Sequence, residues 1–496
     1  MIPSLRLVSL ARAPTWTLAW LALGCAAPPE QEAARAAAPA IERPAPSEQE
    51  AARAAAPARE RSAAAPPASP SSDATQAEPS PSSDAIQVGA PPGLDPSLAA
   101  DPALQRAHAV LARVPLIDGH NDLPWTIREH KEAPGDVAAY DLRAATKGHT
   151  DLPRLRAGRV GAQFWSVYVP GDRPAGDMVR LQLEQIDLAR RMIAQYSDDL
   201  ALALTADEVE AAFQAGRVAS LLGAEGGHTL ANSLATLRAY HTLGVRYLTL
   251  THNVHTDWAD CAVLPPRHDG LTAFGEEVVR EMNRLGMLVD LSHVSPATMD
   301  DALRVSEAPV IFSHSSARAI ADTARNVPDD ILRRIPENGG VVMVTFLPAY
   351  VSQAAGDARE ARRKARAEAA KLADPAARAA RLAEIDAEPQ PRATLAQVAD
   401  HVEHVRRVAG VDHVGLGSDF DGMSAVPVGL EDVSKYPHLL AELARRGWTD
   451  EELEKLAGRN LLRVLRAAEA TAQRLQAARP PSLATCTPAT EDKREP

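Results

Sequence analysis

Histidines and carboxylates follow six short apolar stretches of this chain of 496 residues. The first stretch leads into His120 and Asp122, and residues two apart in an extended segment point the same way. The other five lead into Glu225, His252, His293, His314, and Asp419 with Asp421. A single histidine after a strand is usually a hydrogen-bonded structural residue, whereas six such strand ends indicate a shared site. Imidazoles mixed with carboxylates suit zinc or a similar divalent metal; a polar cluster held by hydrogen bonds alone is the alternative.

Glu225 is the residue best suited to join two metals. It precedes Gly226 and Gly227, so little side-chain bulk surrounds it. Its two carboxylate oxygens can bridge two cations, and four residues are available to complete the two sites: His120, Asp122, His293 and His314. Two adjacent cations polarise a carbonyl and lower the pKa of a shared water, which gives hydroxide near neutral pH. The sequence therefore predicts a hydrolytic, dinuclear site.

Short apolar runs alternate with helix-period stretches across the middle of the chain. The runs are 114–117, 162–169, 219–223, 247–251, 287–291, 309–312, 341–346 and 414–417, and helical spacing is clear at 178–196, 234–243, 274–285 and 395–408. Strand–helix alternation predicts parallel strands joined by crossover helices, and eight units predict a (β/α)8 barrel of the TIM type. An open doubly wound sheet is the alternative. In a barrel the carboxyl ends of all strands meet at one mouth, which would gather the polar residues.

The first hundred residues have the composition of segments outside a folded domain. Residues 1–25 carry two arginines before a short apolar run, as secretory signals do. Their end, "LALGC", resembles a bacterial lipoprotein cleavage box that would place a lipid on Cys25; a plain signal peptide is the alternative. Either interpretation predicts export, and lipidation predicts a membrane-anchored protein facing the periplasm or the cell exterior. Residues 26–97 are rich in Ala, Pro, Ser and Glu and predict a disordered tether.

The folded domain is expected over residues 98–478, followed by a disordered tail over 479–496. A helical insertion rich in Ala, Arg and Glu is expected at about 355–390, interrupted by Pro375. A lid over the barrel mouth and a plain exposed excursion are both compatible with that composition. The net charge of -12 argues against a nucleic-acid partner. The three cysteines, Cys25, Cys261 and Cys486, are too few and too scattered for a disulfide framework.

Longer motifs around these residues resemble those of one enzyme family. They are "IDGHNDLPW", "GAQFWSVYVP", "EGGH", "RYLTLTHN", "LVDLSHVS", "PVIFSHSSAR", "RNVPDD" and "GSDFDG". Over about residues 107–468 the chain resembles the membrane (renal) dipeptidase family of zinc peptidases. The resemblance implies a (β/α)8 barrel with a dinuclear zinc centre. One zinc would be held by His120, Asp122 and Glu225, and the other by Glu225, His293 and His314.

The resemblance also implies roles for four further residues. His252 is similar to a histidine that contacts the substrate and the tetrahedral intermediate, and Tyr350 to a tyrosine that contacts the substrate. Arg325 resembles an arginine that binds the terminal carboxylate, a role suited to the paired donors of a guanidinium. Asp419 resembles the acidic residue that handles the proton near the metals; orienting a zinc-bound histidine is its alternative role. Asp421 fits a structural turn.

These expectations converge on zinc-dependent hydrolysis of free dipeptides by a metal-bridging hydroxide, including dipeptides with a D-residue at the carboxy-terminal position. One alternative is another metal-dependent amidohydrolase, acting on a β-lactam or a cyclic amide. Many of those enzymes bridge their metals with a modified lysine on the fourth strand, where this chain has His252. A non-catalytic, metal-binding lipoprotein is the other alternative. The cysteines that link subunits in animal members of the family are missing, so a non-covalent homodimer is the form of dimer left open.

Overall fold

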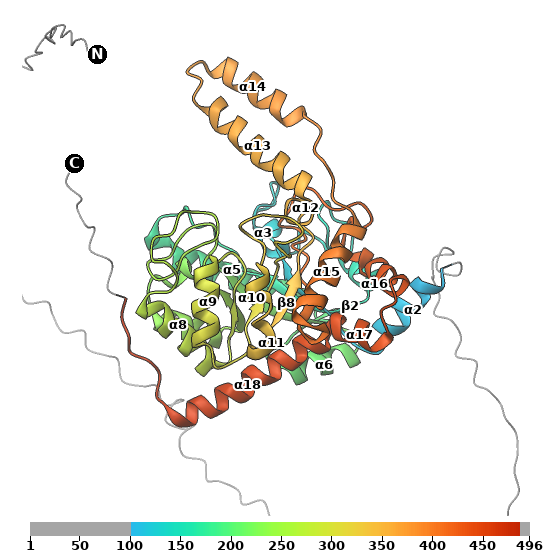
Figure 1. The fold of residues 1–496 in the computed structure, drawn as a ribbon, viewed down its shortest axis with the longest axis vertical. Helices are drawn as coiled ribbons and strands as arrows, with labels where there is room; N and C mark the ends of the chain where they lie inside the picture. Colours follow the sequence, from blue (N-terminus) through green and yellow to red (C-terminus); the bar gives the residue numbers. More distant parts are fainter. Residues whose placement is uncertain (1–100, 487–496) are drawn as a thin grey trace, which may run out of the picture. The chain divides into compact units, whose positions relative to one another are not determined.

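A closed barrel of parallel strands forms the centre of the protein (Figure 1). The computed structural model describes residues 101–486. The eight barrel strands are β1 (Leu116–Asn121), β2 (Val160–Ser166), β4 (Val218–Glu225), β5 (Val245–Thr249), β6 (Leu288–Asp290), β7 (Ile311–Phe312), β8 (Val341–Val344) and β9 (Val414–Leu416). Pairing of β2 with β4 and of β1 with β9 closes the ring. The predicted (β/α)8 barrel is confirmed, and the open doubly wound sheet is excluded.

A ninth strand, which the sequence did not predict, lies beside the start of β4. Strand β3 (Leu200–Leu202) pairs in parallel with the first three residues of β4, beginning with Leu200 against Val218. Strand β5 pairs with β4 only from Leu222 onward. The short β3 therefore covers the part of β4 that β5 does not reach, at the amino-terminal end of the barrel.

Helices connect the strands and cover the outside of the barrel (Figure 1). They are α2 (Pro102–Leu111), α3 (Leu123–Arg128), α4 (Leu152–Ala157), α5 (Met178–Gln195), α6 (Ala206–Gln214), α7 (Leu234–Thr242), α8 (Ala273–Leu285), α9 (Pro296–Val305), α10 (Asp329–Leu332), α11 (Ile335–Asn338), α12 (Pro348–Val351), α15 (Leu395–Ala409), α16 (Tyr436–Arg445), α17 (Asp450–Glu454) and α18 (Asn460–Ala478). Many begin at a side chain that accepts a hydrogen bond from a free backbone N–H of the first turn. Thr272 does so for α8, Ser295 for α9 and Thr394 for α15.

The barrel interior is packed with apolar side chains below its mouth. Ile117, Phe164, Leu221, Leu288 and Met343 belong to one buried cluster there. A larger cluster fills the space between the strands and the surrounding helices. The polar residues at the carboxyl ends of the strands therefore stand on an apolar floor, which keeps water from reaching them from below.

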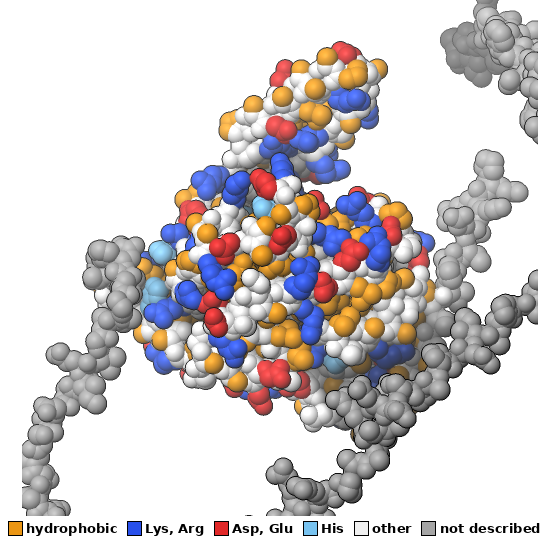
Figure 2. Space-filling model, turned by 180° about the vertical axis from the view of Figure 1, so that it is seen from behind, with side chains coloured by type: hydrophobic (Ala, Val, Ile, Leu, Met, Phe, Trp, Pro, Cys, Tyr) orange, Lys and Arg blue, Asp and Glu red, His pale blue; other side chains and the backbone are white. Residues whose placement is uncertain are grey.

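The predicted insertion between β8 and β9 contains two helices, α13 (Gln353–Ala370) and α14 (Pro375–Ala387). They pack against each other as a hairpin that stands out from the barrel, with basic and acidic side chains mixed along it (Figures 1 and 2). Pro375, which interrupts the pattern in the sequence, is the first residue of α14. Arg362 and Arg366 of α13 both pair with Asp386 of α14.

Several expectations concern residues at the two ends of the chain. The export signal with Cys25 and the tether (26–97) lie outside the described residues, as does the end of the expected tail from 487. Residues 479–486 form no helix or strand, yet the Ser482 hydroxyl donates to Glu277 on α8. No helix within residues 101–486 is long and apolar enough to span a membrane. Cys261 and Cys486 are free.

Candidate active site

The polar residues predicted to form one site meet at the barrel mouth. A cavity of about 300 Å³ opens there, and its lining includes eight of the nine predicted site residues: Asp122, Glu225, His252, His293, His314, Arg325, Tyr350 and Asp419. The ninth, His120, is fully buried beside them and is stacked at 3.9 Å, centroid to centroid, on His314. The fold thus gathers residues from β1 and β4 and from the segments that follow β1 and β5–β9.

The two carboxylate oxygens of Glu225 face opposite halves of this cluster. Oε1 lies 3.0 Å from His293 Nε2 and 3.5 Å from His314 Nε2. Oε2 lies 3.7 Å from His120 Nε2, whose other neighbour, Asp122 Oδ2, is 3.2 Å away. A carboxylate placed in this way can serve two cations, one through each oxygen. The partition of the ligands between two metals, which the resemblance implies, stays a prediction.

Three overlapping groups of side chains are close enough to share a metal ion. They are His120 with Glu225 and His314, Glu225 with His252 and His293, and His120 with Asp122 and Asp419. His120 and Glu225 each occur in two groups, so the site is one continuous cluster of ligands. His314 lies between its two halves, since its Nε2 is 2.9 Å from His293 Nε2 while its ring stacks on His120.

Hydrogen bonds behind the cluster orient two of the imidazole rings. The Ser313 hydroxyl donates to Asp290 Oδ2 at 2.7 Å, so its oxygen is left to accept from His314 Nδ1 at 2.8 Å. His293 Nδ1 lies 3.0 Å from the amide oxygen of Asn253, which can only accept. Each ring therefore carries its proton on Nδ1 and turns the lone pair of Nε2 into the site. Metal-binding histidines are commonly held in this way.

The hydroxyl of Tyr247, on β5, orients the His120 ring. Its Nδ1 lies 2.8 Å from the Tyr247 hydroxyl. The tyrosine ring fits because the residue beside it on β4 is Gly223, where a Cβ would lie 2.0 Å from Tyr247 Cζ. Asp118, two residues before His120, accepts hydrogen bonds from the Ser418 backbone N–H at 2.7 Å and the Tyr436 hydroxyl at 2.6 Å. Asp118 therefore links β1 to the segments after β9 beneath the site.

Two of the site residues have left-handed backbone conformations. The φ angle is 68° at His293 and 72° at Asp419, and it is 64° at Asp421. This region is uncommon for residues with a Cβ, and such strain persists mainly where the surrounding structure enforces it. The strand ends therefore turn sharply at these residues, which directs the His293 and Asp419 side chains into the mouth. The Asp421 carboxylate accepts from the His149 backbone N–H at 2.7 Å, in keeping with a turn role.

Burial sets the charge state of most of the cluster; at His120 burial is outweighed by the carboxylates of Asp122 and Glu225, which raise its pKa to about 10. Burial lowers the pKa values of His293 and His314 well below the usual range, so both rings are neutral and free to donate a lone pair. Burial also raises the pKa of Glu225 to about 8 and that of Asp419 to about 7. Asp122 Oδ1 is buried without a hydrogen-bond partner. Buried carboxylates of this kind are costly unless a positive charge is near, so the donor set fits divalent cations.

Arg325 presents a buried guanidinium to the same cavity. The residue is only 2% exposed, and among residues 101–486 it forms no ion pair. Its hydrogen bonds to Ser315 Oγ and to the His314 carbonyl are both long, at 3.4 Å, and its Nε has no partner. Its Cζ lies 5.2 Å from the centre of the Tyr350 ring. A charged group buried in this way has most of its hydrogen-bonding capacity available for an anionic ligand.

His252 lies on the other side of the cavity. Its ring contacts the rings of Tyr168 and His293, and its Nε2 is 3.9 Å from Glu225 Oε1. Burial lowers its pKa to about 3, so the ring is neutral. A neutral imidazole can donate one hydrogen bond to an oxygen that becomes negative during a reaction.

The cavity also contains residues that the sequence analysis did not select. They are Trp125, Tyr168, Asn253, Leu347 and Arg359. The first three lie inside the motifs "IDGHNDLPW", "GAQFWSVYVP" and "RYLTLTHN", so the sequence contained a signal for them in the motifs that carry the family resemblance. Arg359 belongs to the insertion helix α13, where one arginine among several gives no sequence signal.

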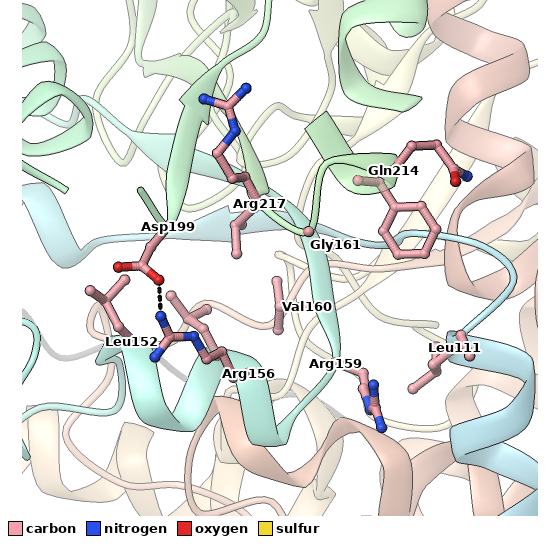
Figure 3. A pocket seen from close by; sticks show the side chains of 14 residues that line it. Leu111, Leu152, Arg156, Arg159, Val160, Gly161, Asp199, Gln214 and Arg217 are labelled. Carbon is pink, nitrogen blue, oxygen red and sulfur yellow. Dashed lines mark hydrogen bonds and ion pairs between the residues drawn. The ribbon is translucent and has the colours of Figure 1, made fainter. Parts of the chain in front are cut away.

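A larger hollow, of about 550 Å³, lies at the amino-terminal ends of β2 and β4. Figure 3 shows that Arg156, Arg159 and Arg217 surround it and that Arg156 pairs with Asp199. The predicted site residues are absent from its lining, whose polar members are Arg156, Arg159, Asp199, Gln214 and Arg217. The chemistry predicted from the sequence is therefore confined to the opposite end of the barrel.

Comparison with known proteins places the chain in one family. The family model "Membrane dipeptidase (Peptidase family M19)" matches residues 104–479. The probable dipeptidase PvdM from Pseudomonas aeruginosa has the same fold, with a TM-score of 0.66 and 24% identity over 75% of this chain and 99% of that one. The metallopeptidase dipeptidase AC is 27% identical, with a TM-score of 0.60, over 72% of this chain and 98% of that one.

A third solved structure contains a ligand. It is a metallopeptidase from Rhodobacter sphaeroides liganded with a phosphinate mimic of the dipeptide L-Ala-D-Ala. It is 26% identical, with a TM-score of 0.59, over 72% of this chain and 99% of that one. The family match covers more than half of the chain, including the whole cluster at the barrel mouth. The chain belongs to the membrane dipeptidase family, peptidase family M19, and is a metallo-dipeptidase.

Proposed function

We propose that this protein hydrolyses free dipeptides with two zinc ions bridged by Glu225, including dipeptides whose carboxy-terminal residue has the D configuration. The observation that carries the proposal is the position of Glu225, with one oxygen 3.0 Å from His293 Nε2 and the other 3.7 Å from His120 Nε2. His120 and Asp122 would complete one metal site, and His293 and His314 the other. The two bound cations would polarise the scissile carbonyl and supply a hydroxide near neutral pH.

Arg325 would bind the carboxylate of the dipeptide. Its guanidinium is buried, forms no ion pair within residues 101–486 and faces a cavity of about 300 Å³, which suits a small substrate. Two parallel hydrogen bonds to a carboxylate would fix the position of the neighbouring amide. Tyr350 packs against the guanidinium and would border the side chain of the carboxy-terminal residue. The relative that holds the L-Ala-D-Ala mimic supports a substrate of this size and stereochemistry.

His252 and Asp419 would act on the reacting atoms. The neutral His252 ring would donate a hydrogen bond to the carbonyl oxygen as it becomes negative. Asp419 would accept a proton from the attacking water and pass it to the leaving amine. Burial raises the pKa of Asp419 to about 7, and Arg325 opposes that shift. In the alternative role Asp419 would orient His120, and loss of its carboxylate would then weaken metal binding as well as turnover.

The test is hydrolysis of a dipeptide panel by the purified full chain, loaded with zinc or stripped with a chelator. The proposal expects zinc-loaded protein to release alanine from L-Ala-D-Ala and from L-Ala-L-Ala, and stripped protein to regain activity on addition of zinc. N-acetylated dipeptides and cyclic amides serve as comparison substrates. Zinc-loaded protein that left every free dipeptide intact while opening a cyclic amide would overturn the proposal.

We also propose export with a lipid on Cys25, and a domain over residues 98–478 that forms a non-covalent homodimer. A tether over 26–97 and a tail over 479–496 would flank this domain. The motif "LALGC" and the composition of the flanks support this arrangement. Metabolic labelling with a fatty acid should mark the wild-type chain and leave Cys25→Ser unlabelled. Labelling of both chains, or of neither, would contradict the proposed lipid on Cys25. Analytical sedimentation of the purified protein would show whether it is a monomer or a dimer.

A further inference from the structure

The insertion hairpin brings a second arginine to the substrate cavity. Arg359 lies on the early part of α13 and lines the cavity together with Arg325 and Tyr350. Its Cζ lies 5.6 Å from the centre of the Tyr350 ring, and Arg325 Cζ lies 5.2 Å from the same centre. Two guanidinium groups therefore share one phenol ring at the edge of the mouth.

The local packing fixes this position. Tyr350 belongs to α12, and α13 begins directly after it, with Ser352 accepting a hydrogen bond from the Ala355 backbone N–H. Gly356 allows the close approach of the two helices, because a Cβ there would lie 2.9 Å from the Ala349 carbonyl oxygen. On the other side, the Asn326 side chain donates to the Tyr350 carbonyl at 2.8 Å. Arg359 is thus carried by a well-packed turn rather than by the free end of the hairpin.

Arg359 differs from its neighbours on α13 in having no acidic partner. Arg362 and Arg366 pair with Asp386, and Arg363 pairs with Glu360. Within residues 101–486 Arg359 forms no ion pair, and its charge acts on Asp419 across the cavity. An exposed arginine without a partner is ordinary on a surface, but this one lies beside a cavity that already holds a buried cation.

We propose that Arg359 selects dipeptides with an acidic side chain on the carboxy-terminal residue. This inference rests on the proposed function, in which Arg325 takes the main-chain carboxylate. The side chain of the same residue starts one carbon away from that carboxylate and would extend along Tyr350 toward Arg359. A substrate with two carboxylates then meets two cations, the deep one at Arg325 and the shallow one at Arg359.

The experiment compares L-Ala-D-Glu with L-Ala-D-Gln, which have nearly the same shape and differ in one charge. We expect wild-type kcat/KM to favour the acidic dipeptide by about fivefold, the effect of one partly exposed ion pair. Arg359→Met should remove this preference, and Arg359→Lys should retain part of it. Arg363→Met, which removes an arginine one helical turn further along α13, where it pairs with Glu360, is the matched control and should leave the preference at its wild-type value.

A second measurement separates this inference from the proposed function. Calorimetric titration with phosphinate mimics of the two dipeptides reports binding even if turnover fails. A preference for the acidic mimic that Arg359→Met abolishes would support the inference, whether or not dipeptides are hydrolysed. If dipeptides are hydrolysed but Arg359→Met lowers kcat/KM for both equally, the proposed function stands and the inference is wrong. The same conclusion follows if wild-type protein does not favour the acidic ligand in either measurement.

Discussion

The two ends of the barrel differ in what they bury. At the carboxyl ends of the strands, the Glu225, His120 and His314 side chains are at most 5% exposed. At the amino ends, the larger hollow has its charged groups near solvent, and Arg156, which pairs with Asp199, is 68% exposed. Size alone would favour the amino-terminal hollow, of about 550 Å³, over the mouth, of about 300 Å³.

The difference shows that buried polarity marks the site better than volume does. Ionisable groups are buried at a cost that only cations, partners or hydrogen bonds can offset. At the mouth that cost is not fully offset by the protein, since Asp122 Oδ1 and Arg325 Nε have no partners. At the other end Asp199 is 13% exposed, and its charge is offset by a pair with Arg156, whose side chain is 68% exposed. Buried polar groups whose partners the protein does not supply therefore mark the mouth as the active site.

The largest effect is expected from Glu225→Gln. An amide oxygen and an NH2 group replace the two oxygens that face His293 and His120, so at least one metal should be lost. Activity on L-Ala-D-Ala should fall by more than about a hundredfold, the upper range for residues that only support a ligand. Metal analysis and kcat/KM measure the two effects. Asp199→Asn, at the opposite end of the barrel, is the matched control and should alter neither. Full metal content and activity in Glu225→Gln would contradict the assignment of the active site to the buried polar groups at the mouth.

Arg325→Met should have the next largest effect. Loss of a charged pair of hydrogen bonds to the substrate carboxylate should raise KM for L-Ala-D-Ala by about 10- to 100-fold. Metal content should stay at the wild-type level, because Arg325 does not belong to the ligand groups. For a dipeptide whose carboxylate is blocked as an amide, wild type and Arg325→Met should have similar KM values. An equal loss for the free and the blocked dipeptide would show that Arg325 acts on the fold rather than on the carboxylate.

Ser313→Ala should weaken metal binding by about tenfold, because support of a metal-binding histidine is typically worth 10- to 100-fold. The variant removes the oxygen that accepts from His314 Nδ1 and the hydroxyl that donates to Asp290. Competition with a fluorescent zinc chelator measures the change. Ser306→Ala, which removes a hydroxyl that donates to the Ala308 carbonyl outside the mouth, serves as the control. Equal affinities in the two variants would show that the hydrogen bond does not orient His314.

The smallest expected effect is a pH dependence of the free energy of unfolding. It arises at a buried histidine outside the metal cluster. His401 is fully buried, accepts from the Ala317 backbone N–H at 3.0 Å and donates to the Val351 carbonyl at 3.0 Å. Burial lowers its pKa from 6.5 to about 4. The folded pKa is below the unfolded one, so the unfolded state gains the proton first. The neutral His401 side chain therefore makes its full contribution to stability above about pH 6.5, and this contribution decreases as the pH falls toward 4.

Between pH 6 and pH 5 this residue should lower the free energy of unfolding by about 1 kcal/mol. Urea unfolding of metal-free wild type and of His401→Gln at both pH values measures it, since other groups contribute to both proteins alike. The wild type should lose more stability than the variant over this interval. Identical losses would show that His401 does not titrate in the folded protein below its ordinary pKa.

The sequence predicted the barrel and the cluster because both have strong local signals. Each of the eight barrel strands is a short apolar run, and six of the runs lead directly into imidazoles or carboxylates. Strand β3 was missed because no chemical group marks its end, although it is no shorter than β6 or β9. Its pairing with β4 depends on the late start of β5, which is a property of the closed sheet.

The parts of the site that the sequence did not predict depend on packing. Arg359 is one of several arginines in α13, and the packing of α13 against α12, where Gly356 lies close to Ala349, decides which of them lines the mouth. Asn253 follows His252 directly, yet its amide oxygen serves the distant His293. Local sequence identifies the groups that can do chemistry, whereas the three-dimensional fold determines which side chains orient them.

The most direct test of the account is a crystal structure of zinc-loaded protein with anomalous diffraction measured at the zinc edge. The account predicts two anomalous peaks at the barrel mouth, one on each side of Glu225, with His293 and His314 at one and His120 and Asp122 at the other. A mouth without anomalous density, or peaks with Glu225 bound to neither, would contradict it.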